Sequence, residues 1–259
     1  MTATDTDRKG AWTRRAVVLG LIAAPVAAFQ LAPRLAGRFG GSHDFEPLAH
    51  PEGFRRLRDA APITAPGPLA GLDEAEGAVY RIAPGDLCTA LFEGAPPPGT
   101  VPIASFTDYN CPYCRVLTGK LAALAEREAD TIRMAWHEWP LLGPTSEIAA
   151  RAALAAKMQG AYTAFHERLM QTRFVPTPAY LGIVAQDIGI DPDRMIADMD
   201  SAEVDTQLAR TAALAREFGF AGTPALVIGR TVVVGNVTEG TVAALVRQEL
   251  RDGPVPACA

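Results

Sequence analysis

The hydrophobic pattern of the chain changes its period within residues 101–130. Apolar or small residues run almost unbroken through "VPIASFTDY", which predicts a buried strand. Apolar positions then recur at the three- and four-residue spacing of a helix, at Val116, Leu117, Leu121, Leu124 and Ala125. The segment "CPYC" therefore lies where a strand passes into a helix.

The rest of the chain continues with alternating blocks of strand and helix patterns. A second strand is predicted in "TIRMAWHEWPLL" and stops at Pro140. About five helices follow over residues 145–218; one has Asp191 as its cap before Pro192, and the last opens with Asp200 and Glu203 in capping-box spacing. Two short strands, "TPALVIG" and "TVVVGN", and the amphipathic helix "TEGTVAALVRQEL" end the pattern. Outside the helical block, this order is the βαβ…ββα order of a thioredoxin fold, so the prediction is an α/β thioredoxin fold with an all-helical insertion.

The first 28 residues have the pattern of a targeting segment. A basic stretch, "RKGAWTRR", precedes an apolar run of 14 residues from Ala16 to Phe29. This run is shorter than the roughly 20 residues of a membrane span and suits a signal peptide cleaved after Ala28. The Arg14-Arg15 pair resembles a twin-arginine signal. We expect export to the periplasm or cell envelope, with an uncleaved signal anchor as the alternative.

Between this segment and the predicted domain, residues 29–76 are rich in Pro, Gly and Ala. They indicate an arm or spacer with at most one short helix, near residues 53–60. The domain itself is expected over residues 77–259. Because the arm has too little apolar periodicity for a dimerisation domain, a monomer is favoured.

Composition and charge narrow the function classes. Hydrophobic residues make up 49% of the 259 residues and charged residues 20%, which is enough for an ordinary core. The formal net charge of −5 gives no reason to expect a nucleic-acid partner.

The four cysteines form an even set, and disulfides persist in an exported chain. Cys111 and Cys114 fit a redox pair, half of a zinc site or a small structural disulfide. A zinc site needs two further ligands, and neither a second CxxC nor an unexplained histidine supplies them, so no metal is expected. For Cys88 and Cys258 a structural disulfide is predicted; a second redox pair and two unpaired thiols are the alternatives.

Three features together resemble the DsbA-like family of thiol-disulfide oxidoreductases. They are "FTDYNCPYC" between strand and helix, the helical insertion, and "GTPALVIG", in which Thr223-Pro224 matches the family's cis-proline loop. The resemblance covers about residues 78–252. It implies an envelope enzyme that exchanges disulfides with client proteins, is reset by a membrane redox partner and uses no cofactor. A non-catalytic binding module of the same fold is the alternative, but it would not need both cysteines.

The chemistry assigns roles within the motif. Cys111 is expected at the N-terminus of the helix beginning near Pro112, where free N–H groups and the helix dipole lower a thiol pKa, so it is the predicted nucleophile. Cys114, one turn on, is the predicted resolving cysteine. Pro112 and Tyr113 between them, and the loop at Pro224, are expected to support the site, and the backbone of Thr223 to pair with a client segment as an added strand.

One position departs from the pattern of the thioredoxin fold. Many members of the fold carry a buried acid six residues before the first cysteine, where this chain has Ser105. Asp108 is the candidate substitute for proton transfer at Cys114; its alternatives are a solvent-facing or a helix-capping side chain. The direction of the reaction is open, and oxidation of client thiols is favoured over reduction or isomerisation.

Overall fold

A computed structural model describes residues 43–58, 63–65, 80–83, 85–171, 175–255 and 258. The predicted signal segment, residues 1–28, and much of the predicted arm lie outside the described residues. Among the residues that are described, no helix is both long and apolar enough to cross a bilayer.

The described strands form one mixed sheet in the order β1-β2-β6-β5-β3-β4. Strand β3 is parallel to β4 and antiparallel to β5, and β5 and β6 form a hairpin. This is the predicted thioredoxin arrangement. The strands are β1 (Phe45–Pro47), β2 (Arg55–Leu57), β3 (Val101–Thr107), β4 (Ile132–Glu138), β5 (Ala225–Ile228) and β6 (Thr231–Val234).

The prediction for the arm was wrong in one respect. Where at most a short helix was expected, near residues 53–60, the chain forms β2, which pairs with β1 and in parallel with β6. Each of the two strands is only three residues long. So short a run shows no periodicity, and its contacts with β6 are what extend the sheet.

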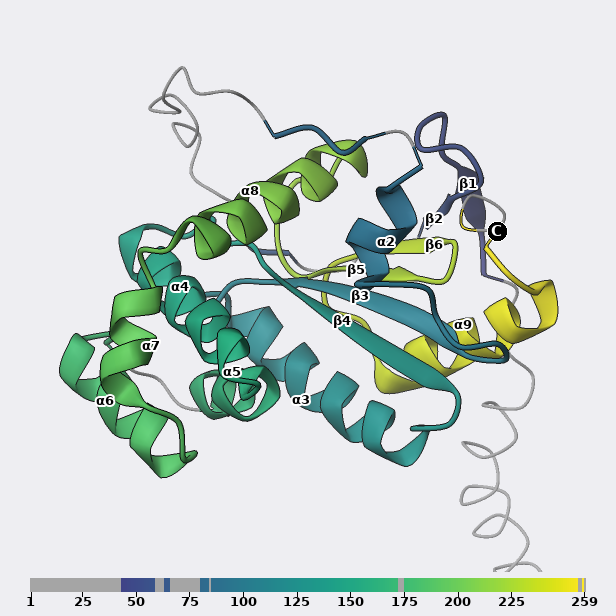
Figure 1. The fold of residues 1–259 in the computed structure, drawn as a ribbon. Coiled ribbons are helices and arrows are strands. Elements are labelled where there is room, and N and C mark those ends of the chain that lie inside the picture. The colour runs from purple at the N-terminus through teal and green to yellow at the C-terminus, as the bar shows by residue number, and fades with distance from the viewer. Residues whose placement is uncertain are drawn as a thin grey trace, which may run out of the picture. The chain divides into compact units, whose positions relative to one another are not determined.

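The helices of the described chain cover both faces of this sheet (Figure 1). They are α2 (Leu87–Phe92), α3 (Pro112–Arg127), α4 (Pro144–Met158), α5 (Tyr162–Gln171), α6 (Pro178–Asp187), α7 (Pro192–Asp198), α8 (Ala202–Glu217) and α9 (Glu239–Asp252). The five from α4 to α8 stand where the helical insertion was predicted. Helix α2 was not predicted.

Alternate residues of β3 divide the core into two clusters. Val101 and Ile103 join a first cluster with α3, α9 and the helices α4–α7. Ala104 and Phe106 face a second cluster with α2 and α8. This alternation follows from the two-residue period of a strand. Ser105, 2% exposed, shares the parity of Ile103 and so lies on the face that carries α3.

Two local predictions about helices are corrected by the structure. Ser201, rather than Asp200, caps α8, because its hydroxyl accepts the Val204 N–H. Val116, predicted as part of the apolar face of α3, is 51% exposed. The predicted cap of α7 at Asp191 is present, and its carboxylate accepts two N–H groups of the first turn.

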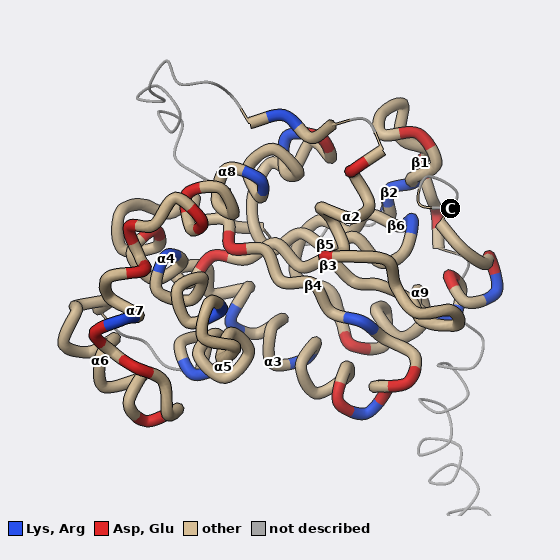
Figure 2. The backbone as a smooth tube through the Cα atoms, in the orientation of Figure 1, with Lys and Arg blue, Asp and Glu red and all other residues tan. Residues whose placement is uncertain are grey.

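Lys and Arg as well as Asp and Glu are spread over the helices (Figure 2). Arg151 of α4 contacts Glu147 within the same helix at 3.0 Å and joins α4 to α8 through Asp205 at 2.8 Å. Exposed pairs of this kind contribute little each, typically about 0.2–1 kcal/mol.

A disulfide joins Cys88 to Cys258 across 170 residues, with 5.4 Å between the Cα atoms. This is the pairing that the sequence favours. Cys88 lies in α2, which packs on the second core cluster. The bond therefore connects the segment after α9 to α2.

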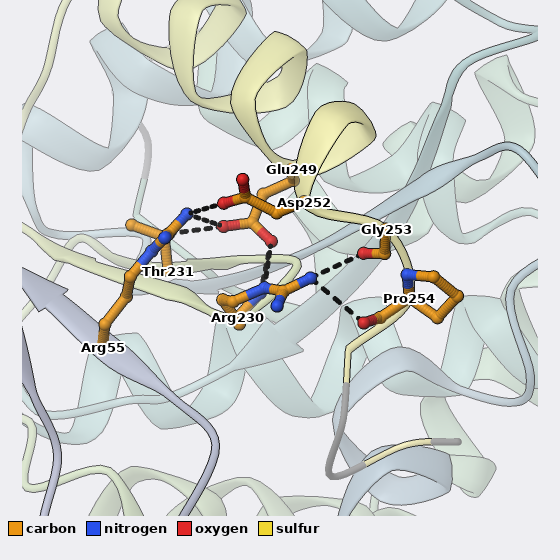
Figure 3. Close-up of polar contacts among 7 residues, drawn as sticks. All are labelled: Arg55, Arg230, Thr231, Glu249, Asp252, Gly253 and Pro254. Carbon is orange, nitrogen blue, oxygen red and sulfur yellow. Dashed lines mark hydrogen bonds and ion pairs between the residues drawn. The ribbon is translucent and has the colours of Figure 1, made fainter.

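A buried carboxylate of α9, that of Glu249, connects this helix to β2 and β6 (Figure 3). Glu249 is 3% exposed and accepts hydrogen bonds from Arg55 of β2 at 2.7 Å and Thr231 of β6 at 2.6 Å. Its other oxygen accepts from the Arg230 side chain at 3.0 Å, and that side chain also donates to the carbonyl of Gly253. Two guanidinium groups thus compensate one desolvated charge.

Removing this carboxylate should destabilise the fold strongly. Glu249→Ala leaves Arg55 and Arg230 partly buried without their main partner, and breaking a buried pair from one side costs about 3–5 kcal/mol. Denaturant unfolding measures the change. Arg58→Ala, which breaks only exposed contacts with Asp44 and Glu46, is the control and should change the unfolding free energy by less than about 1 kcal/mol. Equal effects of the two variants would contradict a structural role for Glu249.

Candidate functional site: a thiol pair at the start of helix α3

Cys111 and Cys114 lie where β3 passes through a short turn into α3. The Cys111 N–H donates to the Asp108 carbonyl at 3.1 Å, which closes the turn. Cys111 is the N-cap of α3 and Pro112 its first residue, as predicted. The Cys111 Sγ accepts the backbone N–H of Cys114 at 3.2 Å. Both cysteines are free thiols and both are buried.

The surroundings of the two sulfurs shift the pKa values of Cys111 and Cys114 in opposite directions. The hydrogen bond from the Cys114 thiol, followed by hydrogen bonds from Thr64 and Thr223 and the Cys114 backbone, lowers the pKa of Cys111 from 9 to about 6 against the opposing effect of burial. Burial, together with the neighbouring Cys111, raises the pKa of Cys114 well above its usual value. At neutral pH the pair therefore holds one thiolate, at Cys111, and one thiol.

The loop before β5 lies against this thiolate. The Thr223-Pro224 peptide bond is cis, and Thr223 is fully buried. The Thr223 carbonyl oxygen is 3.5 Å from Cys111 Sγ. Pro224 thus stands beside the thiol pair, where the resemblance to DsbA-like proteins placed it.

A third segment, residues 63–65, completes the site. Thr64 forms an antiparallel bridge with Thr223, and its Oγ1 lies 3.3 Å from Cys111 Sγ. Thr64 has no signal in the sequence, because it lies in a Pro- and Ala-rich stretch with no periodicity or motif.

Asp108 is buried, so the solvent-facing alternative is wrong. Its carboxylate accepts the N–H groups of Leu141 and Leu142 at 2.7 and 2.9 Å, the hydroxyl of Ser146 at 2.6 Å and the N–H of Asn110 at 2.7 Å. These bonds attach the turn before Cys111 to the segment between β4 and α4. Asp108 therefore anchors the turn before Cys111, and a part for it in proton transfer at Cys114 stays a prediction.

A second buried polar cluster attaches the same turn to the helical insertion. Glu138 Oε1 accepts hydrogen bonds from Tyr109 at 2.8 Å and Tyr162 at 2.6 Å, and lies 3.0 Å from Nδ1 of His166. Burial, reinforced by the charge of Glu138, raises the pKa of both tyrosines well above 10, so they remain hydrogen-bond donors. No local pattern indicates this cluster, because its members come from three separate elements.

Three other residues, in β4 and α3, make structural contacts. Tyr113 is half-buried against the first core cluster. Arg115, which follows the thiol pair, donates to the carbonyls of Leu169 and Met170 and so attaches α5 to α3. The His137 ring donates to the carbonyl of Leu91, 2.8 Å away. Within the described residues, no group of three or more potential ligands is arranged to hold a metal ion.

Comparison with known proteins agrees with this geometry. A family model described as the DSBA-like thioredoxin domain matches residues 102–247. A thioredoxin-like oxidoreductase from Silicibacter pomeroyi is 37% identical; the match covers 62% of this chain and 95% of that one, with a TM-score of 0.57. A periplasmic thioredoxin-like protein from Salmonella enterica serovar Typhimurium is 29% identical over 66% and 99% of the two chains, with a TM-score of 0.53.

Curated relatives include longer proteins. A Na(+)/H(+) antiporter NhaA from Herminiimonas arsenicoxydans is 28% identical over 149 residues, which are 58% of this chain and 24% of the antiporter. The chain thus spans about a quarter of that relative. The fold and the thiol pair define a thioredoxin-fold protein with a CxxC pair at the start of a helix. The chain belongs to the DsbA-like thioredoxin family.

The reactivity of the reduced site should follow the lowered pKa of Cys111. Alkylation should rise through pH 6 and level off by about pH 7.5, because the thiolate is the reacting form and Cys114 stays protonated. Rates measured against pH in the reduced wild type and in Cys111→Ser test this. Cys111→Ser should be nearly inert, and a wild-type midpoint near pH 9 would contradict the assigned surroundings. Because the folded pKa lies below the unfolded one, the reduced protein should also lose stability as the pH falls through 6.

The hydrogen bonds around Glu138 should stabilise the folded protein. Tyr162→Phe removes a hydrogen bond to a buried carboxylate and should cost about 1.5–3 kcal/mol of unfolding free energy. Tyr80→Phe, at a residue that is 38% exposed, is the matched control and should change little. Denaturant unfolding of both variants measures the two changes. An unchanged unfolding free energy in Tyr162→Phe would show that this hydrogen bond does not stabilise the fold.

Proposed function

We propose that this protein is an exported thiol-disulfide oxidoreductase that oxidises the thiols of client proteins. The observation that carries the proposal is the arrangement at Cys111, whose Sγ accepts the Cys114 N–H at 3.2 Å and lies 3.3 Å from Thr64 Oγ1. The Cys114 thiol and these contacts lower the pKa of Cys111, and burial raises the pKa of Cys114. Stabilising the reduced form of a thiol pair makes its disulfide a stronger oxidant, and a thiol of low pKa is a good leaving group.

The reaction begins with the disulfide form of the pair. A client thiolate attacks Cys111 Sγ, the Cys111–Cys114 bond breaks, and Cys114 leaves and takes up a proton. The second client thiolate then attacks the client sulfur of the mixed disulfide and releases Cys111 as a thiolate. The client is oxidised by two electrons, and the pair is reduced by two.

The reduced pair must pass these electrons on before the next cycle. We assign this step to a membrane redox protein that restores the disulfide, with the protein acting as a monomer. The basic and apolar start of the sequence and the relative described as periplasmic support a place in the cell envelope. Client proteins with reduced cysteines are the substrates.

The two cysteines should fail in different ways. With a reduced, unfolded client and glutathione disulfide as the oxidant, Cys111→Ser should abolish oxidation. Cys114→Ser should accept an oxidised sulfur at Cys111 from glutathione disulfide and then accumulate mixed disulfides, because the internal thiol that reverses them is gone. Activity and non-reducing mass analysis measure both effects. The double variant Cys88→Ser/Cys258→Ser is the control and should remain active, because that disulfide is structural.

The direction of the reaction is tested by the equilibrium of the Cys111–Cys114 pair with glutathione. An oxidising potential, close to or above that of glutathione, is expected. A strongly reducing potential would overturn the oxidase assignment and favour a reductase. Loss of activity in the Cys88→Ser/Cys258→Ser control, without unfolding, would reveal a second redox pair.

A further inference from the structure

The backbone edge at Thr223 is already occupied by the chain's own residues. The Thr64 N–H donates to the Thr223 carbonyl at 2.7 Å, and the Thr223 N–H donates to the Thr64 carbonyl at 2.9 Å. This reciprocal pair is how an extended peptide adds to a free strand edge. Residues 63–65 therefore lie where an added strand would.

The side chain of Thr64 is directed at the reactive sulfur. Its Oγ1 is 3.3 Å from Cys111 Sγ. A cysteine has its sulfur attached to the Cβ atom, as threonine has its Oγ1. An extended segment with cysteine at the position of Thr64 would thus bring its own sulfur to Cys111. The hydroxyl of threonine forms no disulfide, so the built-in segment is not consumed.

The close fit at Gly222 supports this interpretation of the contact. A Cβ atom at Gly222 would lie 2.5 Å from the Thr64 carbonyl oxygen and 3.0 Å from the Ala65 Cα atom. Both neighbours are backbone atoms, which cannot turn away as the end of a side chain can. The absence of a side chain at Gly222 is therefore what allows a strand to lie against this edge.

We propose that residues 63–65 are a built-in occupant of the client-binding edge, with Thr64 in the position that a client cysteine takes during exchange. The proposal rests on the proposed function and names its substrate class. The clients are extended or unfolded segments that pair with Thr223 through their backbone, and they must displace residues 63–65 to reach Cys111.

A cross-linking experiment tests the position of Thr64. In the full chain with Cys114→Ser, the added substitution Thr64→Cys is treated with the aromatic disulfide DTNB. Cys111 first forms a mixed disulfide and releases one thionitrobenzoate; the introduced thiolate at position 64 then attacks Cys111 Sγ and releases the second. The expected product carries a disulfide between position 64 and Cys111, and no adduct.

The matched control places cysteine one residue further on. Ala65 is exposed, and the alternation of an extended segment directs its side chain away from that of Thr64. Ala65→Cys/Cys114→Ser should therefore keep its thionitrobenzoate adducts. Peptide mapping with the Cys88–Cys258 bond intact distinguishes the products. Equal yields of cross-link from the two variants would overturn the proposal.

Two further variants separate occupancy of the edge from the contact with the sulfur. Thr64→Pro removes the N–H that bonds to Thr223, whereas Thr64→Val removes the hydroxyl and keeps the backbone pairing. For an unfolded cysteine-containing peptide, kcat/KM should be several-fold higher in Thr64→Pro than in Thr64→Val. The reason is that a larger fraction of the protein molecules then has the edge at Thr223 free to bind the peptide. Equal values for the two variants in an active enzyme would overturn the proposal.

A measurement without a client distinguishes failure of the proposed function from failure of the proposal that residues 63–65 occupy the edge. Labelling of Cys111 by a bulky maleimide should also be faster in Thr64→Pro than in Thr64→Val. If both the cross-link and faster labelling are found but no variant oxidises a client, the proposed function fails and the occupancy of the edge stands. If labelling rates are equal, the occupancy fails, whatever the activity.

Discussion

The hydrogen bond of 3.2 Å from the Cys114 N–H to Cys111 Sγ ties the chemistry of the site to the first turn of α3. An N-cap normally uses an oxygen to accept this orphan N–H group; here a sulfur does so, and accepts it best as a thiolate. Burial would otherwise disfavour the anion. The pKa of Cys111 is lowered mainly by the Cys114 thiol beside it, and then by Thr64, Thr223 and the Cys114 N–H at the helix start.

The rest of the fold holds this helix start in place. Asp108 attaches the turn before Cys111 to the segment after β4, and Tyr109 attaches it to Glu138 and the insertion. Both side chains are buried, and each belongs to the turn that precedes the thiol pair. The insertion is thus more than a cover for the sheet: Tyr162 and His166 of α5 share the carboxylate that fixes the catalytic turn.

The predictable parts of this structure are those with local signals. The change from strand to helix period, Pro112 at the helix start and the Thr-Pro pair before β5 predict the thiol pair and its surroundings in the fold. Long-range contacts have no such signal: β2 is three residues that become a strand beside β6, and Thr64 matters only because Thr223 lies next to it. Val116 was expected to be buried and is exposed. Periodicity predicts which positions of a helix are apolar, but not which of them other elements cover.

The contact at Thr64 affects both the pKa of Cys111 and the access of an extended segment to its sulfur. Its hydroxyl is one of the groups that lower the pKa of Cys111, and its backbone occupies the edge beside the same sulfur. When an extended segment takes its place, that hydroxyl is lost, but the N–H and thiol of Cys114 remain. The main stabilisation of the thiolate therefore belongs to the permanent part of the site, and the removable part contributes the smaller share. Such a division lets residues 63–65 leave without removing the property that makes Cys111 a good leaving group.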